Sequence, residues 1–97
     1  MKDEIVSYIA RLAEASREHP LLALGVSPRG AISLSRMARA RAFLEGRDYV
    51  IPEDVQAVFA DTCAHRVLLS QKAKIEKADE RAVTEELLKT VRLPHSL

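Results

Sequence analysis

The segment from Ser27 to Gly46 constrains the fold most strongly, because it carries both a helix start and a helix stop. Ser27 is a preferred N-cap residue, and Pro28 is favoured at the first helical position. Gly46 supplies the left-handed residue that commonly ends a helix. Apolar surface between these limits is supplied by Ile32, Leu34, Ala38, Ala42 and Leu44. We therefore predict a helix over 28–45 whose apolar side packs against other helices.

Other segments also have helical patterns. Residues 3–18 predict a first helix whose apolar side carries Ile5, Ile9, Leu12, Ala13 and Ser16. Pro52 opens another helix, with Val55, Val58 and Phe59 as its inner face. Asp61 is expected to cap a short helix through Arg66. Asp79 is expected to cap a last helix, which carries Val83, Leu87, Leu88 and Val91 and ends at Pro94.

The intervening segments are expected to be extended or irregular. The apolar connector 21–26 should be held against the core, because its leucines are costly to leave in water. Residues 48–51 and 67–69 have β-branched or apolar character, and 71–78 are polar and expected to be mobile. The predicted fold class is mainly α, a small bundle of about four to five helices. A minor two-stranded pairing is expected near Tyr49-Val50 and Val67-Leu69.

Length and composition indicate one soluble domain. The chain has 97 residues, enough for one hydrophobic core and too few for two. Aromatic residues make up only 4%, so the core must be built from aliphatic residues, which suits packed helices. No apolar run approaches the roughly 20 residues of a membrane span, and no signal peptide opens the chain. Cys63 is the single cysteine, which excludes an intramolecular disulfide and fits a reducing compartment.

The predicted helix start at 27–30 combines features that attract anions. Helix N-termini present backbone N–H groups that lack intrahelical partners, together with the positive end of the helix dipole. Arg29 adds a guanidinium that can bind a phosphate through two parallel hydrogen bonds, and Gly30 adds no bulk. The alternative is that Arg29 is an ordinary surface residue at a helix start.

Arginines are also frequent in the rest of this region. Between residues 29 and 47 the arginines at 29, 36, 39, 41 and 47 accompany a single acid, Glu45. A basic stripe could bind nucleic acid, but the formal net charge of +1 and the absence of interleaved aromatics argue against it. A solvated helix face or a contact surface for a neighbouring subunit are the other interpretations. The candidate subunit-interface residues are Arg36, Arg39, Arg47 and Arg66.

Several kinds of catalytic site are not indicated. The sequence has no Gly-x-x-x-x-Gly-Lys-Ser/Thr loop and no apolar run that ends in paired acids, so it lacks a phosphate cradle and a magnesium site. We therefore expect this chain alone to bind no cofactor, to hold no catalytic residue and not to hydrolyse ATP. His65 has no neighbouring ligands that would make a metal site, and Cys63 is best explained as a small buried hydrophobe.

The order of motifs resembles a known family. The stretch GVSPRGAISLSRMARARAFLEGRDYVIPEDVQAVFADTCAHRVLLS, residues 25–70, is similar to the C-terminal lid of MoxR-family AAA+ ATPases. The family pattern comprises a Gly-Ala-Ser-Pro-Arg helix start, an Ala/Arg-rich helix, Gly-Arg-Asp-Tyr-Val, Pro-Glu-Asp-Val and His-Arg. Residues 1–97 are accordingly expected to form one AAA+ lid domain, a fragment of a longer ATPase.

This resemblance implies a function. Arg29 occupies the position of the family's sensor-2 arginine, which reaches the γ-phosphate of ATP held with Mg²⁺ by the AAA+ core of the same chain. Ser27, Pro28 and Gly30 would support it at the helix N-terminus. The implied parent is a cytoplasmic ring, expected to be a hexamer, that remodels or matures client complexes in a chaperone-like way. Its expected partner is a VWA-domain protein, and no nucleic acid is expected to bind. The alternatives are a small helical nucleic-acid-binding module or a protein-interaction module that uses helix 28–45.

The sequence also departs from the family pattern at three points. Gly30 stands where a small residue such as Ala is usual, and Ile51 replaces the Thr that would cap the next helix. Ala15-Ser16-Arg17 replaces Ala-Thr-Arg. These changes bear on local stability, and none alters Arg29.

Overall fold

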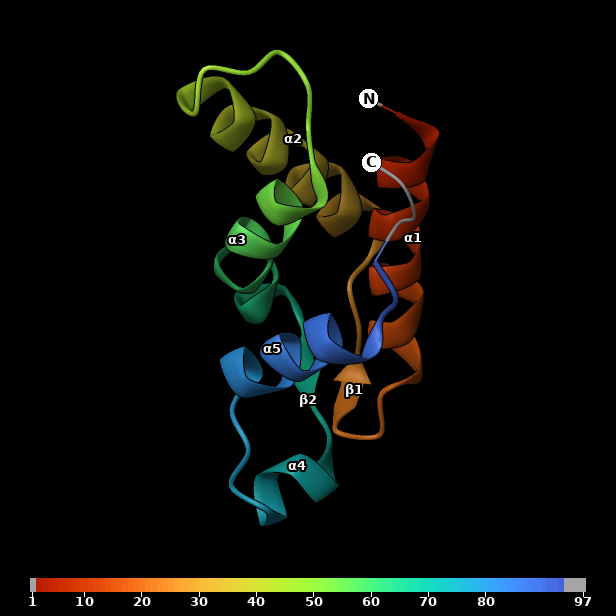
Figure 1. Cartoon of the computed structure of the whole chain (residues 1–97). Coiled ribbons are helices and arrows are strands. Elements are labelled where there is room, and N and C mark those ends of the chain that lie inside the picture. The colour runs from red at the N-terminus through yellow and green to blue at the C-terminus, as the bar shows by residue number, and fades with distance from the viewer. Residues whose placement is uncertain (1, 94–97) are drawn as a thin grey trace.

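The computed structural model describes residues 2–93 and consists mainly of helices (Figure 1). The helices are α1 (Asp3–Glu18), α2 (Pro28–Leu44), α3 (Pro52–Cys63), α4 (Gln71–Ile75) and α5 (Glu80–Thr90), and a 3₁₀ turn, η1 (Ala64–Arg66), follows α3. The strands are β1 (Leu22–Leu24) and β2 (Leu68–Leu69), which pair antiparallel. The mainly α fold class with a minor two-stranded pairing is confirmed. The expected helix stop at Pro94 is wrong, because α5 already ends at Thr90 and Val91 has an extended backbone conformation.

One hydrophobic core joins the helices. α2 packs against both α1 and α3, and α5 lies across α1 and α3 (Figure 1). The largest fully buried side chains come from different elements and include Tyr8, Leu12, Leu34, Phe59 and Leu87. The predicted inner face of α1 is buried throughout. On α2, however, Ile32 and Leu44 are exposed, because the buried stripe consists of Leu34, Ala38 and Ala42 at a spacing of four residues.

The strand pairing differs from the prediction. Leu69 pairs with Leu22 and Leu68 with Leu24. The strand that pairs with β2 is therefore the connector after α1, and not Tyr49-Val50. Tyr49-Val50 belongs to the turn between α2 and α3, at the far end of the molecule from α4 (Figure 1). The tertiary arrangement places the C-terminal end of α1 beside the segment that follows η1, and this decides the pairing.

Two helix boundaries also differ from the prediction. Asp61 does not cap a separate helix, because α3 continues through it to Cys63. Residues 71–78 were expected to lack regular structure, but Ser70 caps α4 by accepting a hydrogen bond from the Ala73 N–H at 3.2 Å. The buried Ala73 gives this short helix a contact with the rest of the fold.

The end of α2 follows the prediction. Gly46 has a φ of +82°, a left-handed conformation that favours glycine. The Gly46 N–H donates to the Phe43 carbonyl and the Arg47 N–H to the Ala42 carbonyl, each at 2.9 Å. This paired arrangement is a Schellman motif, and it turns the chain toward α3.

Candidate functional site

The N-terminus of α2 is held by the connector that leads into it. The buried Ser16 hydroxyl accepts a hydrogen bond from the Val26 N–H at 2.8 Å and donates to the Ala13 carbonyl at 2.6 Å. Arg17 donates through Nη1 to the Val26 carbonyl at 3.0 Å. Both ends of the Val26 backbone unit are therefore bonded to α1, which fixes the position of Ser27.

Gly25 allows this close approach. A Cβ at Gly25 would lie 2.6 Å from the Arg17 nitrogen and 2.6 Å from the Ser16 carbonyl carbon, both backbone atoms. Any side chain there would push the connector away from α1. The glycine is thus required for the position of the α2 start.

Arg29 lies in the first turn of α2, as predicted, and is exposed. The Ser27 hydroxyl accepts from the Gly30 N–H at 3.1 Å, which confirms the N-cap. Within the described chain, residues 2–93, the Arg29 side chain has no hydrogen bond or ion pair. The guanidinium is therefore available to a group outside this chain.

The backbone contributes less to an anion site than the sequence indicated. Pro28 has no N–H, and the Gly30 N–H is bonded to Ser27. Among the first three residues of α2, only the Arg29 N–H remains available. Gly30 is buried, and a Cβ there would lie 3.0 Å from the Val26 Cγ1, so its contribution is close packing against the connector.

Arg36 and Arg39 lie on the exposed side of α2. Neither has a hydrogen bond or ion pair within residues 2–93. They form one side of a groove of ≈ 450 Å³ between α1 and α2, whose other lining includes Val6, Ile9, Ala10, Ala31, Ile32 and Ser35. Val6 and Ile32 are more than half exposed in this groove. The groove thus combines an apolar floor with two available cations.

Arg47 is engaged within the chain. It donates through Nη1 and Nη2 to the two carboxylate oxygens of Asp54 at 2.7 and 2.8 Å, and Arg41 donates to the same carboxylate at 2.7 Å. The hydrogen bonds from Arg47 contribute most to lowering the pKa of Asp54, and those from the Ile51 N–H and Arg41 add to the effect. Together they outweigh burial, which raises the pKa, and the result is a pKa of about 2. Arg47 therefore holds the turn after α2 against the start of α3.

The same carboxylate compensates for Ile51. Ile51 cannot cap α3 with its side chain, but Asp54 reaches back to accept the Ile51 N–H at 2.8 Å. This is the backward half of a capping box, and α3 begins at Pro52 without a side-chain N-cap.

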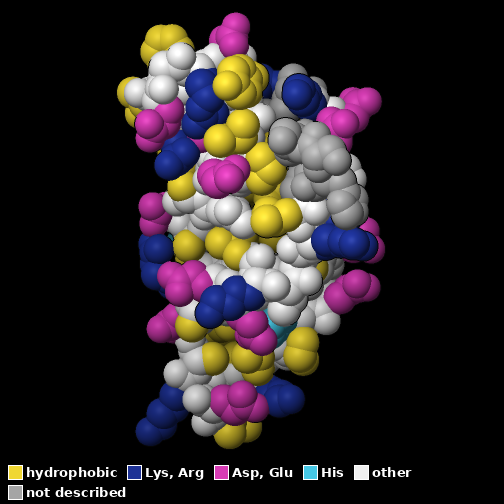
Figure 2. All heavy atoms as spheres, in the orientation of Figure 1, with side chains coloured by type: hydrophobic (Ala, Val, Ile, Leu, Met, Phe, Trp, Pro, Cys, Tyr) yellow, Lys and Arg dark blue, Asp and Glu magenta, His cyan; other side chains and the backbone are white. Residues whose placement is uncertain are grey.

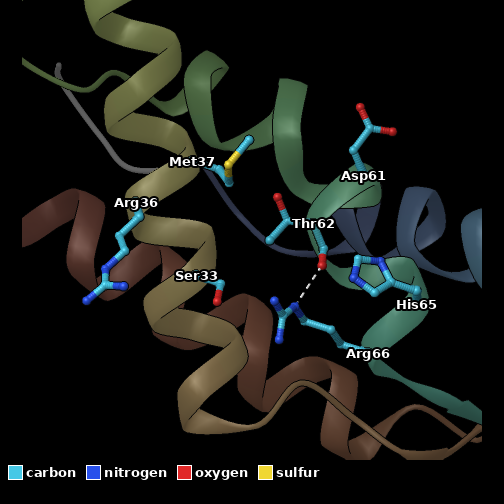
Figure 3. Close-up of a pocket in the computed structure, with 7 residues that line it drawn as sticks. All are labelled: Ser33, Arg36, Met37, Asp61, Thr62, His65 and Arg66. Carbon is cyan, nitrogen blue, oxygen red and sulfur yellow. Dashed lines mark hydrogen bonds between the residues drawn. The ribbon is translucent and has the colours of Figure 1, made fainter.

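Arg66 lies opposite α2. Its Nε donates to the Thr62 carbonyl at 3.1 Å, and its Cδ would lie 3.6 Å from a Cβ at Gly30. The terminal nitrogens have no partner within residues 2–93 and face a cavity of ≈ 330 Å³ between α2 and the end of α3 (Figure 3). His65 is exposed and lines the same cavity.

Sequence reasoning missed an apolar surface at the end of α2. Phe43 is 79% exposed, Leu44 84% and Tyr49 54%. Figure 2 shows hydrophobic side chains gathered at this end of the molecule, where α2 meets the turn toward α3. The sequence does contain a sign of this surface. Residues 42–44 are all apolar, but only one of three consecutive residues can lie on a buried helical stripe with a spacing of four, so the other two must be exposed.

Other candidate chemistry receives no support in the described part of the chain. Cys63 is fully buried, and burial raises the pKa of its thiol to about 11, so it packs as a small hydrophobe as predicted. Across residues 2–93 no group of three or more His, Cys, Asp or Glu side chains is placed to hold a metal ion. None of the helices in this range is long and apolar enough to cross a membrane.

Known proteins are similar to this chain in sequence. The family model of the AAA lid domain matches residues 14–87. "Uncharacterized protein YeaC" of Bacillus subtilis is 42% identical over 92 residues, which cover 95% of this chain and 29% of that protein. "Chaperone MoxR1" of Mycobacterium tuberculosis is 35% identical, with 93% of this chain and 26% of that protein covered.

A solved structure agrees with the sequence matches. The crystal structure of a "putative ATPase" from Cytophaga hutchinsonii superimposes with a TM-score of 0.87 at 35% identity, covering 94% of this chain and 30% of that chain. The chain spans less than a third of the length of each of these three proteins.

The helical fold and these matches define the class of protein: the chain belongs to the AAA lid domain family. Its relatives include "Protein MoxR" of Methylorubrum extorquens, 52% identical over 54 residues that cover 56% of this chain and 16% of that protein. Within the family, the chain is the lid of a MoxR-family AAA+ ATPase.

Proposed function

We propose that this domain is the nucleotide-sensing lid of a longer AAA+ ATPase, and that Arg29 is its sensor-2 residue. The observation that carries the proposal is the exposed, unbonded Arg29 guanidinium at the capped start of α2, within residues 2–93. Bonds from the connector to α1 fix this start, so a force on Arg29 is transmitted to the body of the lid.

An arginine suits this task for two reasons. It stays charged at physiological pH, and its planar fork can donate two hydrogen bonds to one phosphate. A contact with the γ-phosphate exists with ATP and is lost with ADP. Only such a difference in contact lets the nucleotide shift the equilibrium between two lid positions.

The wider role is proposed from the family. The parent would hold ATP and Mg²⁺ in its core, form a hexameric cytoplasmic ring, and couple hydrolysis to chaperone-like remodelling of client complexes. "Chaperone MoxR1", the relative from M. tuberculosis, supports the chaperone part of this role. Arg36, Arg39 and Arg66 would contact neighbouring subunits. Arg47 already donates to both carboxylate oxygens of Asp54, so it could contact a neighbouring subunit only if it shared these hydrogen bonds with that subunit. A VWA-domain protein is the proposed partner.

The first prediction concerns Arg29 in the full-length parent. Arg29→Ala should lower ATP affinity or turnover by about 10-fold or more, because hydrogen bonds to a charged group contribute about 1.5–3 kcal/mol. Arg29→Lys should retain part of the activity, since it keeps the charge but not the fork. Steady-state turnover and the dissociation constants for ATP and ADP are the measurements.

Lys89→Ala provides the control, because Lys89 is an exposed cation on α5, outside the proposed subunit contacts. Its ATP affinity should equal that of the wild type. Equal ATP and ADP affinities and turnover for Arg29→Ala and wild type, with both proteins folded, would rule out Arg29 as the sensor.

The groove between α1 and α2 favours a second function, a protein-interaction module. Its exposed Val6 and Ile32 beside Arg36 and Arg39 suit an amphipathic, acidic protein segment better than nucleic acid, which would require stacking or base-reading groups. DNA binding that falls steeply with added salt and is lost in Arg36→Gln/Arg39→Gln would instead favour the nucleic-acid alternative.

A further inference from the structure

The cavity between α2 and the end of α3 contains a buried hydroxyl that the fold does not use. Thr62 is 7% exposed, and its Oγ1 has no hydrogen-bond partner within residues 2–93. Threonines elsewhere in the helices donate to carbonyls three residues back, as Thr84 does to Arg81 at 2.8 Å. A buried hydroxyl without a partner is costly to the folded state, so its placement requires an explanation.

Thr62 and Arg66 line the same cavity. The cavity is lined by Ser33, Arg36, Met37, Asp61, Thr62, His65 and Arg66, and Figure 3 shows the Arg66 guanidinium directed toward Ser33 while Thr62 points to Met37. The Nε bond to the Thr62 carbonyl orients Arg66 and leaves its two terminal nitrogens as donors. Arg36 extends away from Arg66 in the same view.

The charges around the cavity favour a negative ligand. Asp61 is the one acid in its lining, and its carboxylate is turned outward and paired with Arg81 of α5. The terminal nitrogens of Arg66 are donors, and the hydroxyls of Thr62 and Ser33 can donate as well, while Arg36 and His65 complete the polar lining. Such a set matches the acceptor-only oxygens of a carboxylate.

We infer that this cavity binds an acidic side chain presented by another protein segment. Its ≈ 330 Å³ is enough for one side chain, and the Met37 side chain and the stem of Arg66 can pack against an aliphatic stem such as that of glutamate. Met37 is 47% exposed and unbranched, so it can turn aside and open the way to the Thr62 hydroxyl. This inference involves no nucleotide and does not depend on Arg29.

The test is an NMR titration of the 97-residue chain with the peptide acetyl-Ala-Glu-Ala-amide, compared with the same peptide carrying Gln. The Glu peptide should cause saturable shifts at the Ser33 and Thr62 amides and at the Met37 methyl group. The Gln peptide should not, since it lacks the charge. Binding should be about 10-fold weaker in Arg66→Gln and in Thr62→Val, because each loses a hydrogen bond to a charged group.

Two controls separate this role from others. Lys89→Gln removes one positive charge from α5, outside both the cavity and the groove between α1 and α2, and its affinity for the Glu peptide should be unchanged. Thr62→Val has nearly the same shape and removes only the unbonded hydroxyl, so its melting temperature should equal or exceed that of the wild type. A melting temperature several degrees lower would show that the hydroxyl supports the fold instead.

Other results would overturn the inference. Tighter binding of inorganic phosphate than of the Glu peptide would make the cavity a phosphate site. Binding of free glutarate without binding of the peptide would point to a small metabolite. Equal weakening of peptide binding in Lys89→Gln and Arg66→Gln would show that only the overall charge matters, and the absence of saturable shifts would exclude the site.

Discussion

At the scale of single residues, Asp54 joins three parts of the chain. It is fully buried and binds Arg41 of α2, Arg47 of the turn and the backbone at the start of α3. A Pro-Glu-Asp sequence predicts acids in the first turn of a helix, where the dipole favours them. It does not predict which acid turns inward, because that depends on where the arginines of α2 lie.

The pKa of Asp54 leads to a prediction about acid stability. A pKa lowered from 3.8 to about 2 in the folded state corresponds to roughly 2 kcal/mol of stability. Because the folded pKa is the lower one, this contribution is fully present above pH 3.8 and is lost as the pH falls toward 2. Asp54→Asn should therefore lower the free energy of unfolding by about 2 kcal/mol at pH 7.

Urea unfolding at several pH values provides the measurement. The difference between wild type and Asp54→Asn should shrink as the pH falls from about 4 to about 2. Asp48→Asn is the control, because Asp48 is exposed and has no ion pair within residues 2–93. A difference that stays constant across this pH range would contradict the assignment of the shift to Asp54.

At the scale of elements, the sequence predicted the long helices more accurately than their short neighbours. α1 and α2 have start and stop signals that act locally, such as Ser27, Pro28 and Gly46. The extended pieces have no comparable signal, since 22–24, 48–51 and 67–69 are all apolar enough to pair. Two strands can pair only where the packed helices bring them together. β2 therefore pairs with β1, which lies beside it in the tertiary structure, and not with Tyr49-Val50.

Ser70 links these short elements and supports a prediction. Its hydroxyl caps α4 and also donates to the Pro20 carbonyl at 3.0 Å, while its N–H donates to the Leu21 carbonyl at 2.9 Å. Ser70→Ala removes both side-chain bonds and should cost about 1 kcal/mol. Hydrogen exchange of the α4 amides should quicken more than that of α1.

Ser7→Ala is the matched control for this change. Ser7 lies on the exposed side of α1, and its replacement by a better helix former should leave the free energy of unfolding unchanged or slightly higher. Equal exchange rates of the α4 amides in Ser70→Ala and wild type would show that α4 does not depend on this cap.

At the scale of the whole molecule, the core is shared by α1, α2, α3 and α5, and stability depends on residues that face it. Leu87 is 2% exposed, whereas Leu44 is 84% exposed although the sequence placed it on the apolar side of α2. Leu87→Ala should cost about 2–5 kcal/mol, the range for truncation of a buried leucine. Leu44→Ala should stay within about 0.5 kcal/mol.

Thermal and urea unfolding of both variants check this prediction. Because the described helices share one core, each variant should unfold in one cooperative transition seen equally by circular dichroism and by tyrosine fluorescence. A large loss of stability in Leu44→Ala would mean that the end of α2 is covered in solution. Separate transitions for α5 and for α2 would contradict a single core.

The sequence by itself determined the long helices, the caps at Ser27 and Gly46, the position of Arg29 at the start of α2 and the inert character of Cys63. These follow from signals that act within a few residues, such as capping, fixed φ angles and helical periodicity. Tertiary structure alone decided the β1–β2 pairing, the exposure of Phe43 and Leu44, the burial of Asp54 between two arginines and the cavity that joins Thr62 to Arg66. Each of these depends on how separate elements pack against one another, which no signal within a few residues determines.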